Sequence, residues 1–439
     1  MERRTFLKGA AGAGLFASMP SIINAAETKR VFKVAIIGCG GRGCGGRGAT
    51  GGAARDIRNA AKMAGCEIKF TAAADFFMDK AKAFASKWQI DEKYCFDGAT
   101  GYKKIFELDP AHKPDIVLLT TPLNFRAVHL DAAVKAGVHV FAEKGVSVDP
   151  ATTRLFLAAS REAAAKKLTI VAGTQRRHQR SYILQAMGLK RGVIKPVLGG
   201  VISWNGAVPW VRRREAGMSN KAYMCNNWLN FTELSGDHIC EQHVHNIDVA
   251  NWFIGRLPRT ALSFGARVRR TTGNQYDFFS TDFDYGDGVH IHSMCRQIGG
   301  CYSNVGESFR TVDGSMKGGT GRFTADGKTV SLQDLASDGI DGVLSGNPYE
   351  IEHFNLLRSV MGTGPYYNEG ETVALSTACA VMARISAYTG QIVRLSDILE
   401  NKDSKFYNMN CGPSPYDFEK EGDIEMPAYA DDKCYLPPA

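Results

Sequence analysis

A short glycine-rich turn is the first stretch of this chain whose residue types could do chemistry. Gly38, Gly40 and Gly43 follow an apolar run at residues 34–37 with the spacing G-x-G-x-x-G. In this pattern the first glycine permits a tight turn, the second lets the backbone approach a pyrophosphate, and the third lets the next helix pack close to its strand. The N-terminus of that helix attracts negative charge. The spacing alone is weak evidence, but it indicates a dinucleotide site.

An acidic residue further along the chain supports this interpretation. Asp75 ends the next predicted strand, residues 68–74. A carboxylate at this place accepts hydrogen bonds from both adenosine ribose hydroxyls and repels a 2′-phosphate, so the sequence favours NAD over NADP. The separation between turn and carboxylate is unusually long because of a glycine-rich insert at residues 44–55. The insert either lies over the phosphates or is a flexible surface loop.

Alternating strands and helices must position these residues. Further strands are predicted at residues 114–120, 138–142 and 169–171, and helices at residues 78–88, 126–136 and 151–167. This alternation predicts a doubly wound parallel sheet, whose strands present ligand-binding residues at their carboxyl ends. Thr120, Thr121 and Pro122 follow one of these strands, and Glu143 and Lys144 follow the next.

The second half of the chain has a different pattern. Beyond Gly173, β-like segments occur at residues 198–204, 261–268, 278–283, 289–295 and 306–312. They predict a mostly antiparallel sheet, backed by helices at residues 244–253 and 374–389, with an open face free to cover the cofactor. We therefore expect an α/β chain with four parts: a signal segment at 1–30, a Rossmann domain at 31–172, an α+β domain for substrate and oligomerisation at 173–400, and an extended tail at 401–439.

Composition excludes some classes of function. The 439 residues have room for two domains, and the formal charge of +8 is mild for this length. No run of Lys and Arg with interleaved aromatics occurs, so we expect no nucleic-acid partner. The 11 cysteines form no C-x-x-C pair, and their spacing predicts neither a disulfide framework nor a metal site.

The N-terminus resembles an export signal. Arg3 and Arg4 precede a weakly hydrophobic stretch at residues 9–19, which is a twin-arginine pattern; a basic disordered N-terminus is the alternative. The stretch is too short and glycine-rich to span a bilayer stably. Twin-arginine machinery exports folded proteins, and free NAD is not supplied outside the cytoplasm. A periplasmic or otherwise exported enzyme would therefore have to retain its NAD and regenerate it within each turnover.

Several further motifs occur in an order that is typical of one family. They are Thr121-Pro122 with His129, Glu143-Lys144, residues 173–178 and residues 241–248. With the glycine turn they resemble the Gfo/Idh/MocA family, named for glucose–fructose oxidoreductase, inositol dehydrogenase and a rhizopine-catabolism protein, over residues 33–388. The resemblance implies bound NAD, oxidoreductase activity on a sugar or polyol, and a homo-oligomer formed through the open sheet face.

A set of residues is expected around NAD. It comprises Gly38, Gly40, Gly41, Arg42, Gly43, Asp75, Thr120, Thr121, Pro122, Asn124, His129, Glu143, Lys144 and Gln175. In the family a proline follows the Glu-Lys pair. Here Gly145 takes that place, so we expect a less rigid turn.

The same resemblance implies the catalytic residues. Lys144 would lie near the reacting hydroxyl and the nicotinamide, where an ammonium stabilises an alkoxide-like oxygen or tunes a neighbouring base. The Asp-x-x-x-His motif of the family is represented by Glu241 and His245. Positions i and i+4 share a helical face, so both are expected to point into one cleft. Histidine suits proton abstraction near neutral pH. We expect His245 to be the general base, and Glu241 to orient it or to bind a substrate hydroxyl.

A metal site is the alternative interpretation of this histidine-rich stretch. His238, Glu241, His243 and His245 are suitable ligand types. However, His243 and His245 cannot share a helical face, and hydride transfer to nicotinamide needs no metal. We therefore predict none.

Other residues are candidates for substrate contacts. Arg176 and His178 are expected to line the crevice between the domains. Trp210, Tyr223 and Trp228 belong to an aromatic and amide-rich set that either holds a sugar ring or forms core.

Three functions remain open at this stage. The first is an exported oxidoreductase that retains and recycles NAD. The second resembles the exported glycosidases of glycoside hydrolase family 109, which oxidise a ring hydroxyl transiently, eliminate the aglycone, add water and return the hydride. The third is a non-catalytic sugar-binding protein, against which the presence of Lys144 and His245 argues.

Overall fold

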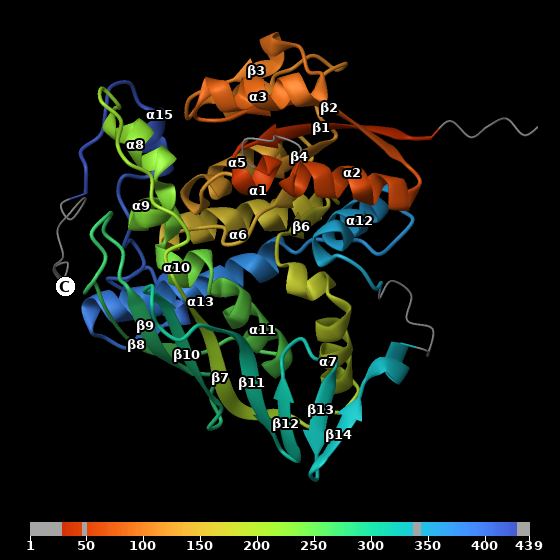
Figure 1. Ribbon diagram of the computed structural model, residues 1–439, viewed down its shortest axis with the longest axis vertical. Coiled ribbons are helices and arrows are strands. Elements are labelled where there is room, and N and C mark those ends of the chain that lie inside the picture. Colours follow the sequence, from red (N-terminus) through yellow and green to blue (C-terminus); the bar gives the residue numbers. More distant parts are fainter. Residues whose placement is uncertain (1–28, 46–50, 337–343, 428–439) are drawn as a thin grey trace, which may run out of the picture.

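The computed structural model describes residues 29–45, 51–336 and 344–427, which form two sheets with helices around them (Figure 1). Residues 1–28 of the expected signal segment, residues 46–50 of the glycine-rich insert and residues 428–439 of the tail lie outside the described residues. Among the helices that are described, none has both the length and the apolar character needed to cross a membrane.

The first sheet has six strands in the order β3-β2-β1-β4-β5-β6, and every neighbouring pair is parallel. Their bounds are β1 (Val31–Ile37), β2 (Glu67–Ala74), β3 (Cys95–Phe96), β4 (Ile116–Leu119), β5 (His139–Ala142) and β6 (Ile170–Ala172). All side chains of β4 are buried, as expected for a strand that is covered on both faces. The strand order reverses direction at β1, where such sheets bind nucleotides. The predicted Rossmann sheet is confirmed.

Helices cover both faces of this sheet. One face packs against α4 (Gly101–Phe106), α5 (Leu123–Lys135), α6 (Pro150–Ala165) and α13 (Gly370–Thr389). The other packs against α2 (Gly52–Ala64), α3 (Met78–Trp88) and α12 (Pro348–Met361). Local sequence signals explain several boundaries. For example, the Asp149 carboxylate accepts a hydrogen bond from the N–H of Thr152, 2.8 Å away, and Pro150 occupies the first turn of α6.

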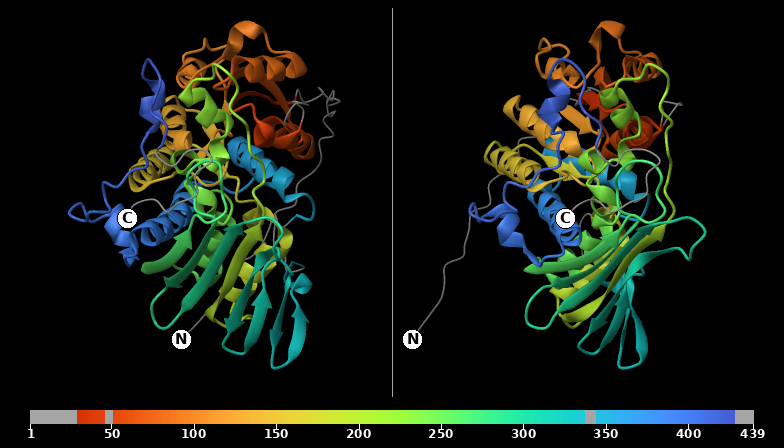
Figure 2. Two further views of the ribbon diagram at one scale, coloured as in Figure 1. Left: turned by 60° about the vertical axis from the view of Figure 1, so that its left-hand side comes forward. Right: turned by 90° about the vertical axis from the view of Figure 1, so that its left-hand side faces the viewer.

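The second sheet has nine strands in the order β14-β13-β12-β11-β7-β10-β9-β8-β15. Their bounds are β7 (Val197–Gly206), β8 (Thr260–Ala266), β9 (Phe278–Asp284), β10 (His290–Gln297), β11 (Asn304–Thr311), β12 (Gly314–Lys317), β13 (Arg322–Ala325), β14 (Lys328–Ser331) and β15 (Val393–Arg394). Apolar side chains from α7 (Arg180–Lys190), α11 (Val244–Ile254) and α13 pack on one face. No helix of the described chain covers the opposite face (Figure 2), where Phe264 is 66% exposed. The predicted large, mostly antiparallel open sheet is confirmed.

Two features differ from the sequence-based expectation. The pair β7 and β10 is parallel, because β8, β9 and β10 form a meander whose third strand runs in the direction of β7. Helix α12 was not predicted, and it returns from the second half of the chain to pack beside α2 on the first sheet. Because α12 and α13 both contact the first sheet, the domain boundary at residues 172 and 173 stays a prediction.

Candidate active site

The glycine turn between β1 and the next helix leaves open space above Gly40 and Gly41, and we call this surface the glycine ledge. Gly38 has a φ of 102°, and a side chain there would lie 2.7 Å from the backbone of Thr120. A Cβ at Gly43 would lie 2.4 Å from the carbonyl oxygen of Gly38. In contrast, a Cβ at Gly40 or Gly41 would meet nothing within 4 Å. The residues therefore fit a dinucleotide: two glycines close the turn, and two leave room for a pyrophosphate.

The different roles of Gly43 and Gly40 can be distinguished experimentally. We expect Gly43→Ala to destabilise the protein by about 1–3 kcal/mol because backbone must move to admit the methyl group. Gly40→Ala should leave the unfolding temperature unchanged and weaken NAD binding roughly tenfold, about 1.4 kcal/mol, because its methyl group occupies the space of the pyrophosphate. Thermal unfolding and NAD titration of both variants measure the two effects. Equal behaviour of the two variants would contradict this division of roles.

The helix that follows the turn is short. Helix α1 (Gly41–Cys44) has four residues and ends at Gly45, whose φ is 74°. Helix α2 begins only at Gly52, after the insert. One cationic side chain near the ledge comes from elsewhere: Lys80 of α3 lines both the pocket beside Asp75 and the larger cleft. Sequence reasoning missed Lys80, because nothing in its helix distinguishes it from a solvated lysine.

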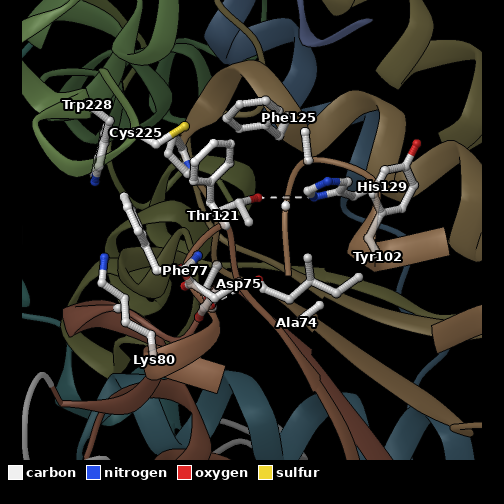
Figure 3. A pocket seen from close by; sticks show the side chains of 18 residues that line it. Ala74, Asp75, Phe77, Lys80, Tyr102, Thr121, Phe125, His129, Cys225 and Trp228 are labelled. Atoms are coloured by element: carbon white, nitrogen blue, oxygen red, sulfur yellow. Dashed lines mark hydrogen bonds between the residues drawn. The ribbon is translucent and has the colours of Figure 1, made fainter. Parts of the chain in front are cut away.

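Asp75 lines a pocket (Figure 3), and Gly38 and Gly40 of the glycine turn line the same pocket. Its Oδ2 accepts a hydrogen bond from the N–H of Cys39 at 2.7 Å, and its Oδ1 accepts one from the N–H of Phe77 at 3.0 Å. Burial raises the pKa of the Asp75 carboxyl. Because two backbone donors fix the carboxylate and each oxygen keeps a further lone pair, both oxygens are oriented to accept ribose hydroxyls.

Replacing Asp75 tests the ribose assignment. We expect Asp75→Ala to reduce the preference for NAD over NADP about 10- to 100-fold, which corresponds to roughly 1.5–3 kcal/mol for hydrogen bonds to a charged group. Binding constants for both nucleotides measure the preference, with the exposed Asp109→Ala as control. An unchanged preference in Asp75→Ala would count against the assignment.

The residues after β4 form another wall of the same pocket. Thr120 Oγ1 donates to the carbonyl of Gly38 at 2.5 Å. Thr121 and Pro122 line the pocket with His129, and Thr121 Oγ1 lies 3.1 Å from His129 Nδ1. Burial lowers the pKa of His129 to about 3, so this ring is neutral. Asn124 does not line the pocket, and its side chain instead donates to the carbonyl of Pro413 at 3.4 Å.

The residues after the next strand, β5, bring Lys144 to Glu241, which lines the cleft. Lys144 Nζ donates to the backbone carbonyl of Glu241 and lies 3.1 Å from its Oε1. Glu241 ends α10 (Asp237–Glu241), whereas His245 lies in the first turn of α11. The expected single helical face is therefore wrong, because the chain breaks between two short helices. Lys144 contacts Glu241, and its charge helps to lower the pKa of His245.

His245 is held as a neutral ring. It is 6% exposed, and its ring stacks on Trp204 with 5.6 Å between centroids. Burial lowers its pKa well below the ordinary value, and the charges of Lys144 and Arg176 lower it further. Its Nδ1 is buried and has no hydrogen-bond partner among the described residues. A neutral imidazole is the form that accepts a proton.

Gly145 is explained by the crowding of the lysine turn. A Cβ at this position would lie 2.7 Å from the carbonyl oxygen of Cys240, so no side chain fits between the two domains. Arg126 donates hydrogen bonds to the carbonyls of both Lys144 and Gly145. The turn is therefore held by a buried guanidinium, and the expected loss of rigidity is offset.

Arg42 faces carboxylates of the protein. Its guanidinium lies 2.5 Å from Glu143, 3.1 Å from Asp56 and 3.2 Å from Glu352 of α12. Burial alone would raise the pKa of Glu143, but Arg42, Arg126 and Lys144 hold it below its ordinary range. Arg42 therefore fixes the residue before Lys144. Glu352 had no sequence signal, because it lies in the unpredicted helix.

The residues after β6 divide between the cleft and the interior. Arg176 pairs with Glu307 of β11, and its guanidinium lies 5.8 Å from the Trp204 ring. Gln175 is partly buried, with an Oε1 that has no partner among the described residues. His178 is 1% exposed and lies in the interior, so the structure does not bring it into the cleft.

Residues from later in the chain enclose the imidazole ring of His178. Asn355 lies 2.9 Å from Nδ1 of His178, and Glu369 lies 3.3 Å from its Nε2. Arg177, the residue before His178, forms a two-pronged ion pair with Asp248 at 2.8 and 2.9 Å.

The aromatic set is also divided. Trp210 and Trp228 meet edge to face at 5.9 Å and line a cleft of about 1020 Å³ together with Gly40, Gly41 and Glu241. Tyr223 is buried against Phe231 and does not line this cleft. Arg212 and Arg213 also line this cleft. They were missed because they lie in an irregular loop.

The histidines near Glu241 do not gather around one point. His243 Nε2 lies 2.7 Å from Ser293 Oγ, and the His238 ring packs on Phe279. Within the described ranges, no group of three or more His, Cys, Asp or Glu side chains is arranged to hold a metal ion.

Comparisons with known proteins agree with this geometry. Residues 32–171 match the model of the GFO_IDH_MocA family, described as "Oxidoreductase family, NAD-binding Rossmann fold". No curated protein sequence matches the chain.

Solved structures of similar fold cover most of the chain. An oxidoreductase from Thermotoga maritima is 20% identical, with a TM-score of 0.61 over 84% of this chain and 100% of that one. The aldose-aldose oxidoreductase from Caulobacter crescentus, solved with glycerol, is 16% identical, with a TM-score of 0.62 over 83% and 100%. The WlbA dehydrogenase from Chromobacterium violaceum, in complex with NADH and UDP-GlcNAcA, is 16% identical, with a TM-score of 0.62 over 84% and 96%. At these identities the similarity shows a shared fold.

Proposed function

We propose, from the premise that residues 32–171 are an NAD-binding Rossmann domain of the Gfo/Idh/MocA oxidoreductase family, that this chain oxidises a hydroxyl of a sugar or polyol and recycles a retained NAD. One observation carries the proposal. Lys144 binds Glu241 and acts electrostatically on a neutral His245, and Glu241 lines the same cleft as the glycine ledge.

The chain's own residues suit alcohol oxidation. Bound NAD supplies the hydride acceptor. His245 takes the hydroxyl proton on Nε2, since its Nδ1 is buried. The ammonium of Lys144 stabilises the developing alkoxide, and Glu241 fixes that ammonium through the contact at 3.1 Å. In the reverse direction the same groups return the proton to a carbonyl oxygen, so a second substrate regenerates the cofactor.

A carbohydrate substrate is supported by the cleft. The edge-to-face pair Trp210 and Trp228 offers an aromatic surface in the cleft that Glu241 also lines, and aromatic surfaces commonly hold sugar rings. Two proteins of similar fold are described with an aldose reaction and with a sugar nucleotide, respectively.

A redox-neutral glycosidase is the second candidate, and the Glu241 carboxylate favours it. After transient oxidation of a ring hydroxyl, the C–H beside the ketone is acidic. A base must remove this proton while the aglycone leaves, water then adds, and the hydride returns to the ketone. His245 and Glu241 would provide the two proton acceptors that this sequence needs.

Export belongs to the same proposal. Arg3 and Arg4 begin the twin-arginine pattern, and a periplasmic location is what makes cofactor retention necessary. Fractionation of cells that express the wild type or the Arg3→Lys, Arg4→Lys double variant tests this. Equal amounts of both chains in the periplasm would contradict it.

Self-association through the open sheet is also proposed. Its uncovered face exposes apolar side chains such as Phe264 and Val201, 66% and 39% exposed, which is unusual for a face that stays in water. Analytical ultracentrifugation of the wild type and Phe264→Glu measures it, and a wild-type monomer would contradict it.

An assay without added NAD separates the functions. A panel of nitrophenyl glycosides and free sugars is mixed with the purified protein while aglycone release and nicotinamide absorbance are followed. Product formed from two sugars in a redox couple supports the oxidoreductase. Aglycone release with no net NADH supports the glycosidase, and binding with neither would contradict both.

A further inference from the structure

The pocket beside Asp75 has walls from both halves of the chain. Ribose hydroxyls bound at Asp75 would place the attached adenine in the remainder of this pocket, which Phe77, Tyr102 and Phe125 line. Cys225 and Trp228 of the second half line it as well (Figure 3). The adenosine end of the cofactor would therefore be enclosed by two walls, one from the first half of the chain, with Tyr102 and Phe125, and one from the second half, with Cys225 and Trp228.

The C-terminal tail is attached to the wall from the first half of the chain through Tyr102. Glu419 ends α15 (Pro415–Glu419), and its Oε1 accepts a hydrogen bond from the hydroxyl of Tyr102 at 2.9 Å. Its Oε2 lies 2.5 Å from Lys103 Nζ. Tyr102 is itself a wall residue, so the tail contacts the pocket through a residue that would touch the cofactor.

The same tail is attached to the wall from the second half of the chain through helix α8 (Asn220–Asn226), which contains Cys225. The Asp423 carboxylate accepts hydrogen bonds from the N–H groups of Asn220 and Lys221, at 2.7 and 2.9 Å. Lys221 Nζ donates to the carbonyl of Lys420 at 2.6 Å, and the Asn220 side chain donates to that of Ile424 at 2.6 Å. These four bonds hold the start of the helix that ends next to Cys225.

Phe418 lies between the two attachments. It is 3% exposed and packs edge to face on Phe125 at 5.2 Å. It shares one apolar cluster with Tyr223 and Met224 of α8. The tail therefore links the wall of the first domain to α8 by a buried ring and by charged contacts on each side. In Figure 1, α15 lies close to α8, at the same edge of the molecule.

We infer that residues 412–426 are a latch that closes the adenosine pocket and slows the release of NAD. This inference rests on the proposed function, because a recycling enzyme gains from a slowly leaving cofactor. Affinity differences within one binding site arise mostly from the rate of release. In this inference the cofactor leaves when Phe125 moves away from α8, and Phe418, which packs on Phe125 and shares a cluster with α8, opposes that movement.

The rate of NADH release tests the latch without any need for turnover. Protein loaded with NADH is mixed with excess NAD, and the loss of bound nicotinamide fluorescence is followed. We expect Phe418→Ala to release NADH at least about tenfold faster than the wild type. The matched control is Phe406→Ala, which removes an equally buried tail ring that packs on the second-domain core, away from the pocket.

A second variant covers the case in which Phe418→Ala does not fold. Glu419→Gln combined with Asp423→Asn weakens both attachments without creating a cavity, and faster release is expected again. Release at the wild-type rate in the folded variants, or equal acceleration in Phe406→Ala, would overturn the latch. A wild type that loses its NAD on dialysis would contradict cofactor recycling, whereas the ratio of the release rates would still decide on the latch.

Discussion

Lys144→Ala is expected to lower kcat about 10²- to 10³-fold, the usual effect of removing a donor that stabilises a developing oxyanion. The ammonium is fixed by two oxygens of Glu241 and lies at the end of β5, on a turn that Arg126 holds. Because it is a fixed charge, it would stabilise the alkoxide without reorganisation during the reaction. Steady-state kinetics with a substrate from the sugar panel measure the loss.

A matched control shows whether the loss is local. Lys135→Ala removes an exposed lysine of α5 that pairs only with Asp131 among the described residues, and its kcat should equal that of the wild type. Lys144→Ala should still bind NAD, since the glycine ledge and Asp75 are untouched. A kcat within a factor of about three of the wild type in Lys144→Ala would contradict the catalytic role.

His245→Ala is expected to have the second large effect, a loss of about 10²- to 10⁴-fold in kcat/KM, as found for general bases. His292→Ala is the control, because His292 is exposed on the open sheet and contacts Ser280 at 3.1 Å. Wild-type rates in His245→Ala would show that another group takes the proton.

The pH dependence of kcat/KM is an independent test of the role of His245. Burial and the nearby cations lower the pKa of His245 well below its ordinary value of 6.5, so the neutral base form persists as pH falls through that value. The acid limb of kcat/KM is therefore expected below 6.5 in the wild type. In the residual activity of Lys144→Ala it should move to higher pH, because one charge that depresses the pKa is lost. A shift in the opposite direction would contradict the coupling.

The first sheet could be predicted because its strands carry their own signal. The run at residues 34–37 is apolar throughout and ends in glycines, so both burial and the turn are visible locally. Helix α12 is different: its buried side includes the ionisable Glu352, which contacts Arg42, a residue far away in sequence. A pattern of apolar periodicity alone does not detect a helix face that is buried through an ion pair.

Site residues were predictable where a strand end fixed them. Lys144 and Asp75 follow strands, so the edge of the sheet determines where they lie. His178 and Tyr223 had the same residue types as true cleft residues, and only tertiary packing decides between them. His178 is enclosed by Asn355 and Glu369, which are 177 and 191 residues away in sequence, so no local pattern contains these contacts.

The number of turnovers per bound NAD tests the proposed function most directly. Purified protein, dialysed free of unbound nucleotide, is mixed with an excess of a donor sugar and of a second sugar that accepts the hydride, and product is counted against the NAD that is released on denaturation. A retained and recycled cofactor predicts many products for each NAD, with the nicotinamide absorbance returning to its starting value. Product that stops at one equivalent until free NAD is added would contradict recycling and would indicate an ordinary dehydrogenase with an exchangeable cofactor.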